Sequence, residues 1–356
     1  MPFIQLMRNE VFVKRNKLTE MMIRAYVNKV IREIQDDPER GFQSLIELGN
    51  KLGDRQTKRA FLDRAAKELH NKNSVYYKLL ENTFCRADAK AIAEFGINIG
   101  YHSLTAGIQE LRENANKKGC KLPWTIFFDM SWGSYPSSES ISEIIRQGKE
   151  LGIYCYMFHI DRKYTGIQSL LELFQRHSDC ANILFLYPDT VSRQLAARIV
   201  GLKNTFVFLK LDNEDKQEEK EAVNQLLNGK CLCGGFLRYS SQSKITGDET
   251  FLQLADNLGL PFLCMMSNEK FRPPGIYGMK KFVGNNRDEL KTPVFPIDLW
   301  EDIADIGRSA GTGACLLTVS GCDQIIVTDM EQKKNTGGIA INRPLNGILT
   351  EYLKRN

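Results

Sequence analysis

The residues best suited to chemistry lie where predicted strands end. Asp129 ends an apolar strand at 124–129, and His159 and Asp161 follow a second strand at 153–158. A histidine oriented by either carboxylate could act as an acid–base pair, because imidazole titrates near neutral pH. The same histidine could instead be only a structural hydrogen-bonding group. We favour the structural interpretation, because no nucleophile, phosphate loop or metal set accompanies His159 in the sequence.

A wider set of polar and aromatic residues also follows predicted strands, and these are our candidate ligand-binding residues. They are Trp132, Arg162, Lys163, Asp212, Arg238 and Tyr239. The cations among them suit an anion such as a carboxylate or phosphate. The sequence predicts no metal site, because its four histidines never approach ligand spacing with one another.

Alternating apolar strands and amphipathic helices position these candidates. Strands are predicted at 124–129, 153–158, 182–187, 205–211, 231–239 and 261–266, with a further apolar run at 294–297. Helices are predicted between them, at 137–152, 166–177, 189–200, 212–227 and 248–258. This alternation indicates an α/β protein with a parallel sheet, either barrel-like or doubly wound, in which chemistry lies past the carboxyl ends of the strands.

The two ends of the chain follow other patterns. Apolar residues recur every three or four positions from Lys17 to about Lys118, which predicts helices throughout, with a break near 96–100. Two β runs at 314–328 predict a hairpin, and a helix is expected at 345–353. We therefore divide the chain into a helical region (1–118), an α/β region (119–300) and a C-terminal extension (301–356).

Composition excludes several classes of function. The net charge is only +5 and the basic residues are interspersed with acidic ones, so a nucleic-acid-binding surface is not expected. No apolar run approaches the ~20 residues that span a bilayer, and the N-terminus has no secretory signal pattern. Nine cysteines without paired spacing indicate reduced thiols in a cytoplasmic protein.

Three stretches resemble a known family. The strand at 124–129, the segment at 144–158 and the stretch at 176–180 look like a branch of the radical SAM superfamily with a C-terminal SPASM extension. The resemblance covers about residues 85–356 and is strongest over 144–158. It implies a partial (β/α)6-type TIM barrel after an all-helical N-terminal region, and a SPASM-like hairpin plus helix at 301–356.

The residues that this family uses for catalysis are missing from the chain. Its members carry Cys-x3-Cys-x2-Cys after the first strand to hold a [4Fe–4S] cluster, whereas no cysteine occurs between Asp129 and Ile144. They carry Gly-Gly-Glu-Pro after the second strand to hold SAM, where this chain has Ile-Asp-Arg-Lys at 160–163. Arg308 and Val327 stand where the extension would place cluster cysteines. The aromatic residues Trp132 and Tyr135 could fill the former cluster site.

Two functions are therefore compatible with the sequence. The first is a non-catalytic radical-SAM-like pseudoenzyme that binds or regulates a protein or peptide partner. The second is an enzyme or small-molecule binder that reuses the barrel mouth through His159, Asp161 and Arg238. Both predict no iron–sulfur cluster and no other cofactor, with residual SAM binding as the less favoured alternative. The sequence does not specify the partner, the ligand or the oligomeric state.

Overall fold

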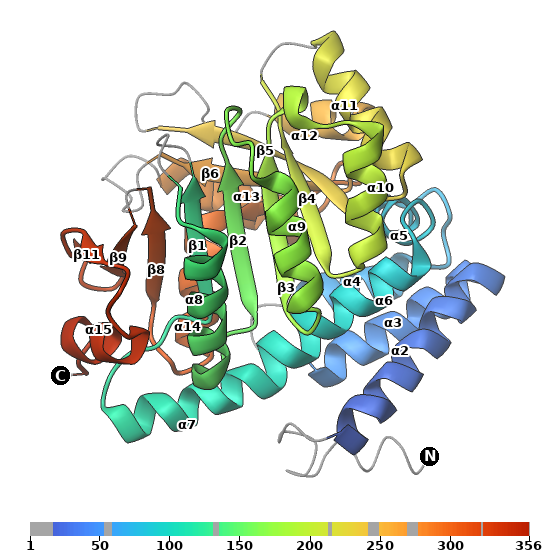
Figure 1. The fold of residues 1–356 in the computed structure, drawn as a ribbon. Coiled ribbons are helices and arrows are strands. Elements are labelled where there is room, and N and C mark those ends of the chain that lie inside the picture. The colour runs from blue at the N-terminus through green and yellow to red at the C-terminus, as the bar shows by residue number, and fades with distance from the viewer. Residues whose placement is uncertain are drawn as a thin grey trace.

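The computed structural model describes residues 17–52, 59–130, 135–212, 216–240, 249–268, 277–321 and 323–355. Strands and helices alternate from residue 125 to residue 320 (Figure 1). The strands are β1 (Thr125–Met130), β2 (Cys155–Ile160), β3 (Ala181–Leu186), β4 (Thr205–Lys210), β5 (Cys233–Tyr239), β6 (Phe262–Ser267), β7 (Phe295–Asp298), β8 (Cys315–Ser320), β9 (Gln324–Asp329), β10 (Lys334–Asn335) and β11 (Ile339–Ala340). The predicted parallel α/β sheet is confirmed.

One curved sheet contains all of these strands. Its order is β10-β9-β8-β1-β2-β3-β4-β5-β6-β7, and β8 through β7 along this path run parallel. The apolar run at 294–297 forms edge strand β7, so the sheet is wider than the six strands first expected. The predicted hairpin forms as β8 and β9, and β8 pairs with β1 rather than standing apart from the sheet. No hydrogen-bonded ladder joins β7 to β8 in the described ranges, so the barrel is open there.

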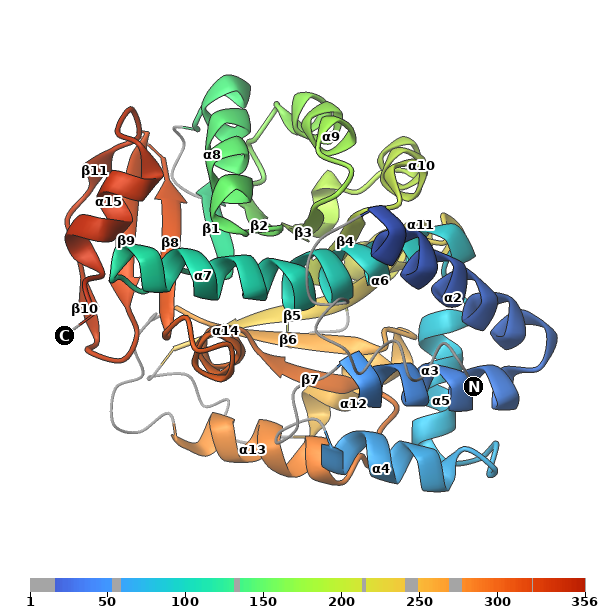
Figure 2. The same cartoon turned by 90° about the horizontal axis from the view of Figure 1, so that it is seen from below.

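The helices between the strands cover the outer face of the sheet (Figures 1 and 2). They are α8 (Ser138–Leu151), α9 (Ile167–Arg176), η3 (Pro188–Thr190), α10 (Arg193–Leu202), α11 (Gln217–Asn228), α12 (Thr250–Asn257) and α13 (Tyr277–Asp288). Helix α8 illustrates how the sequence sets these boundaries. The Ser137 hydroxyl accepts a hydrogen bond from the Ser140 N–H at its start, and Gly152 ends it in the left-handed conformation with φ of +102°.

Helix α14 (Leu299–Ser309) lies at the open side of the barrel, and it contacts β6, β7 and β8. Two tryptophans anchor it there. Trp300 Nε1–H donates to the Ser267 carbonyl at 2.8 Å, and Trp124 Nε1–H donates to the Ile303 carbonyl at 2.9 Å. Helix α15 (Leu345–Tyr352) packs on α8 beyond the hairpin.

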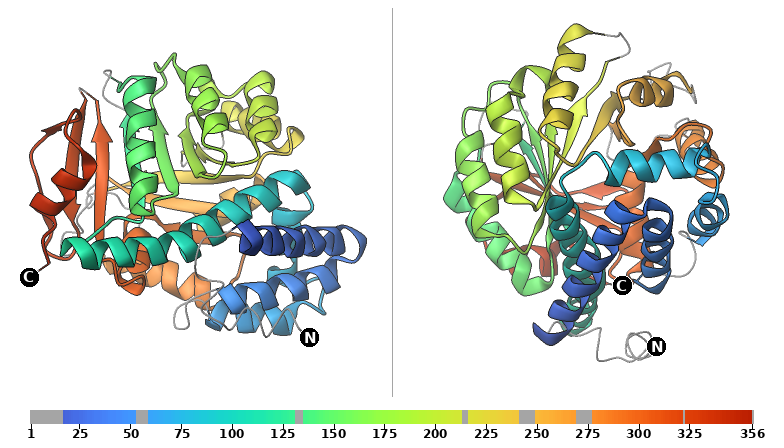
Figure 3. Two further views of the ribbon diagram at one scale, coloured as in Figure 1. Left: turned by 60° about the horizontal axis from the view of Figure 1, so that its bottom comes forward. Right: turned by 90° about the vertical axis from the view of Figure 1, so that its right-hand side faces the viewer.

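The N-terminal region consists of helices and short turns wherever it is described, and Figure 3 shows its first helices, up to residue 68, at the end of the molecule away from the hairpin. Its helices are α2 (Lys17–Asp36), α3 (Pro38–Leu52), α4 (Arg59–Glu68), α5 (Val75–Phe84), α6 (Ala89–Ile97), η2 (Asn98–Gly107) and α7 (Ile108–Lys118). The predicted break near 96–100 is wrong, because α6, η2 and α7 run on as one helix in which η2 has wide π-type turns.

This long helix lies across the amino ends of the strands, opposite the end where the candidate residues lie (Figure 1). Asn98 fixes it there, because its side-chain amide donates to the carbonyls of Ser178 and Cys180, just before β3. No helix in the described part of the chain is long and apolar enough to cross a membrane.

Candidate functional site

The centre of the candidate site is a pair formed by His159 and Asp129. These residues lie opposite each other in the ladder of β2 and β1, near the carboxyl ends of both strands. The Nδ1 atom of His159 lies 3.3 Å from Oδ1 of Asp129. The imidazole is 2% exposed, whereas the Asp129 side chain is 22% exposed. Of the two carboxylates that the sequence offered to His159, the structure places Asp129 beside it.

Two aromatic rings flank the imidazole. The Tyr187 ring centre lies 6.0 Å from that of His159, and Phe236 meets it edge-on at 6.1 Å. The remaining ring nitrogen, Nε2, is buried and has no hydrogen-bond partner among the residues that the structure describes. A buried polar atom without a partner costs about 1–3 kcal/mol, so this atom is the clearest sign of unused binding capacity at the site.

The carboxylate of Asp161 makes a local hydrogen bond in the turn that follows β2. Its Oδ1 accepts the backbone N–H of Lys163 at 2.7 Å, which closes a turn directly after β2. Arg162 lies in this turn, at the end of the barrel formed by the carboxyl ends of the strands, which we call the barrel mouth. The guanidinium carbon of Arg162 lies 4.8 Å from the Tyr187 ring centre, and its Nη1 lies 3.7 Å from Oδ2 of Asp189. Both charged side chains are about half exposed.

The other predicted ligand-binding residues do not join His159. Asp212 is held by Lys210 and Lys216, at 2.7 and 3.0 Å, and the hydrogen bond from Lys210 lowers the pKa of its carboxyl group. The Nε–H of Arg238 donates to Oδ1 of Asn268 at 2.8 Å near the surface. Tyr239 is buried, and strand alternation places it on the opposite face of β5 from Arg238. Trp132 lies outside the described residues.

The interior of the barrel beneath His159 is filled by aromatic side chains. Phe185 stacks on Phe208 at 5.3 Å and meets Phe236 edge-on at 5.3 Å. Trp300 meets Phe127 edge-on at 5.1 Å. All five rings are at most 5% exposed. Sequence reasoning missed Trp300 and Phe236 as neighbours of the site, although strand alternation places Phe236 on the face of Arg238.

Metal-binding side chains are not gathered together in the part of the chain that the structure describes. No group of three or more His, Cys, Asp or Glu side chains among the described residues is arranged to hold a metal ion. Cys155 and Cys231, far apart in the chain, lie deep in the fold, and burial raises the pKa of each thiol to about 12. Such thiols are the opposite of the activated thiolates that bind metals. The five residues directly after β2, at 161–165, also include no glycine that would allow a ligand close to the backbone.

Thiol burial predicts a selective labelling pattern. Iodoacetamide at mildly alkaline pH is expected to modify Cys85, which is exposed, and to leave Cys155 and Cys231 unmodified in the native protein. Peptide mass spectrometry measures the extent at each site, with urea-unfolded protein as the control in which all sites react. Native-state modification of Cys155 as fast as that of Cys85 would contradict the burial of its strand.

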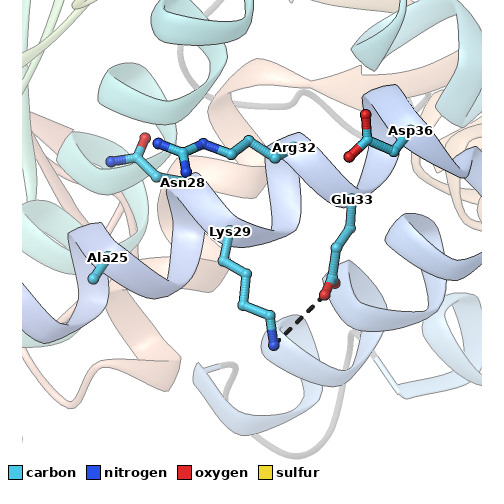
Figure 4. A pocket seen from close by; sticks show the side chains of 6 residues that line it. All are labelled: Ala25, Asn28, Lys29, Arg32, Glu33 and Asp36. Carbon is cyan, nitrogen blue, oxygen red and sulfur yellow. Dashed lines mark ion pairs between the residues drawn. The ribbon is translucent and has the colours of Figure 1, made fainter.

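A separate hollow of 360 Å³ lies on helix α2, among the helices at the opposite end of the strands from His159. Figure 4 shows its lining: Ala25, Asn28, Lys29, Arg32, Glu33 and Asp36. Lys29 and Glu33 form an ion pair across one helical turn at 3.5 Å. The hollow is lined by surface charges of both signs, so it has none of the buried polar atoms that distinguish the mouth.

No protein-family model and no curated protein sequence matches the chain. Among solved structures, SuiB from Streptococcus suis is similar over 81% of this chain and 81% of its own, with 10% identity and a TM-score of 0.50. SuiB bound to S-adenosylmethionine matches 68% of this chain and 67% of its own, with 8% identity and a TM-score of 0.49. The chain therefore has the radical-SAM-like fold that the resemblance in its sequence implied.

Proposed function

We propose that this chain is a radical-SAM-like pseudoenzyme that works without an iron–sulfur cluster, by binding a protein or peptide partner. The observation that carries the proposal is the filled interior of the barrel. Phe127, Phe185 and Trp300 pack against one another there, so these rings leave no space between them for a cofactor or substrate. Truncating these side chains to make room would leave a cavity, and each ring removed would lower the free energy of unfolding by about 3–5 kcal/mol.

The thiol chemistry supports the same proposal. A cluster needs thiolates that converge on one point, and the loop after β1 contributes none, because residues 131–134 are Ser-Trp-Gly-Ser. The described cysteines are free thiols, which suits the reducing cytoplasm that we propose as the location of the protein.

A second function has one specific observation in its favour. The buried Nε2 of His159, beside Asp129 and below the turn that carries Arg162, suits a small-molecule site at the mouth. Such a site needs neither cluster nor SAM, so it is compatible with the first proposal. Asp161 and Arg238, grouped with His159 in the sequence, are engaged with Lys163 and Asn268 instead.

Anaerobic reconstitution with ferrous iron and sulfide tests the proposal. We expect no visible charge-transfer absorption and no iron or sulfide retained after gel filtration. We also expect no saturable heat when SAM is titrated into the protein. Stoichiometric iron and sulfide that remain bound, and that are lost in Cys155→Ser or Cys231→Ser, would overturn the proposal and restore the chemistry of the parent family. A matched Cys85→Ser variant controls for iron held by an exposed thiol.

A further inference from the structure

We propose that the barrel mouth binds a small hydroxylated anion, whose hydroxyl donates a hydrogen bond to Nε2 of His159 and whose anionic group lies beside Arg162. This inference rests on the cluster-free mouth described above and names the class of ligand that would occupy it. Hydroxy acids and sugar phosphates share this chemistry, since both carry a hydroxyl group a few bonds from an oxyanion.

The polarity of the hydrogen bond follows from Asp129. A carboxylate only accepts hydrogen bonds, so the ring nitrogen that faces it, Nδ1 of His159, carries the proton. In the neutral ring, Nε2 then carries no proton, and its lone pair can accept a hydrogen bond. A ligand that satisfies this buried atom must therefore offer a donor such as a hydroxyl group.

The position of Nε2 distinguishes it from an ordinary surface group. His159 is 2% exposed, and Nε2 has no partner in the described portion of the chain. The ring cannot turn to solvent without leaving Asp129, and Phe236 meets it edge-on at 6.1 Å. A donor supplied by a ligand would remove the cost of this unmet acceptor, so binding there gains more than a hydrogen bond at the surface does.

The charge of the ligand follows from Arg162. Its guanidinium lies 4.8 Å from the centre of the Tyr187 ring, and that same ring lies 6.0 Å from the imidazole of His159. The separation of 3.7 Å between Arg162 and Asp189 is longer than a direct hydrogen bond. The N–H groups of a guanidinium can bind a carboxylate or phosphate in bidentate geometry, so an anion could compete with Asp189 for Arg162. The His159 imidazole and the Arg162 guanidinium thus both lie next to the same tyrosine ring.

Calorimetric titration of the full chain with matched probes tests both halves of the inference. Glycerol 3-phosphate and glycerate are the two-group probes, because each carries both a hydroxyl and an anionic group. Inorganic phosphate and acetate, which carry only an anion, and glycerol, which carries only hydroxyls, are the single-group probes. We expect at least one two-group probe to bind about tenfold more tightly than the single-group probes, since one well-placed hydrogen bond is worth roughly that factor. The tighter of the two identifies phosphate or carboxylate as the natural anion.

Variants separate the two contacts. We expect His159→Asn to reduce the affinity for the two-group probe about tenfold and to leave that for inorganic phosphate unchanged. Arg162→Gln should weaken the two-group probes and the anions alike. His177→Asn is the matched control, because that histidine lies at the far, amino end of the strands, 3.3 Å from Ser142 Oγ. It should bind every probe as the parent chain does.

Nitrogen-15 NMR of the histidine rings gives a readout that does not depend on affinity. The chain has only four histidines, so His159→Asn assigns the resonance of interest. In spectra recorded at a pH where the ring is neutral, we expect the proton on Nδ1, and a shift of Nε2 when the two-group probe is added. Equal affinities for all probes, or an Nε2 that carries the proton, would overturn this inference even if no cluster assembles. Assembly of a cluster would instead refute the proposed function.

Discussion

Replacing Trp300 with alanine is expected to lower the free energy of unfolding by about 3–5 kcal/mol, the range for removing a large buried ring. Trp300 is 5% exposed, meets Phe127 edge-on at 5.1 Å, and donates its indole N–H to the Ser267 carbonyl at 2.8 Å. It joins α14 to the interior of the barrel at the side where β7 and β8 do not pair. Urea unfolding followed by circular dichroism measures the change.

Two further variants show which part of the side chain matters. Trp300→Phe keeps most of the ring packing and loses the hydrogen bond, so we expect a loss of about 1–2 kcal/mol. Tyr352→Ala removes an aromatic ring that is 41% exposed, and its effect should stay within about 0.5 kcal/mol. If Trp300→Ala were no more destabilising than Tyr352→Ala, the barrel interior would not be the packed core described here. The pseudoenzyme proposal would then lose its main support.

Most of the architecture follows from local patterns in the sequence. The alternation of apolar strands with capped helices locates β1 to β6, because strand and helix periods differ sharply and Ser137 and Gly152 delimit α8. The pairing of β8 with β1 could not be foreseen, because hydrogen bonding between strands far apart in sequence leaves no local signal. The break predicted near Gly96 failed for a related reason. The long helix packs across the amino ends of the strands, and this packing keeps it continuous although the glycines at 96 and 100 lower its helix propensity.

The site was predictable only in part. Parallel strands place their carboxyl ends at one edge, so the proximity of Asp129 and His159 follows from their positions after two successive strands. The choice between Asp129 and Asp161 depends on side-chain direction within a turn, which the sequence leaves open. The aromatic filling was also hidden, because Trp300 comes from a helix whose place inside the open barrel depends on the whole fold.

Gly152→Ala is expected to destabilise the protein by about 3 kcal/mol, through backbone strain added to a steric clash. Gly152 ends α8 with φ of +102°, a conformation that residues with a side chain rarely adopt. A Cβ atom there would lie 2.7 Å from the Gly107 carbonyl oxygen and 2.9 Å from the Leu111 nitrogen. Both atoms belong to the backbone of the long helix, so neither can move aside as a side chain would.

Gly119 is the matched control for this prediction. It ends α7 with φ of +61°, and a Cβ atom at this position would meet nothing within 4 Å. Gly119→Ala therefore has the strain without the clash and should cost only about 1 kcal/mol. Urea unfolding of both variants isolates the contact between the long helix and the end of α8. Because β2 carries His159, we also expect Gly152→Ala to perturb the Nε2 resonance, and Gly119→Ala to leave it unchanged. Equal losses of stability in the two variants would show that the long helix does not press against α8 as closely as these distances require.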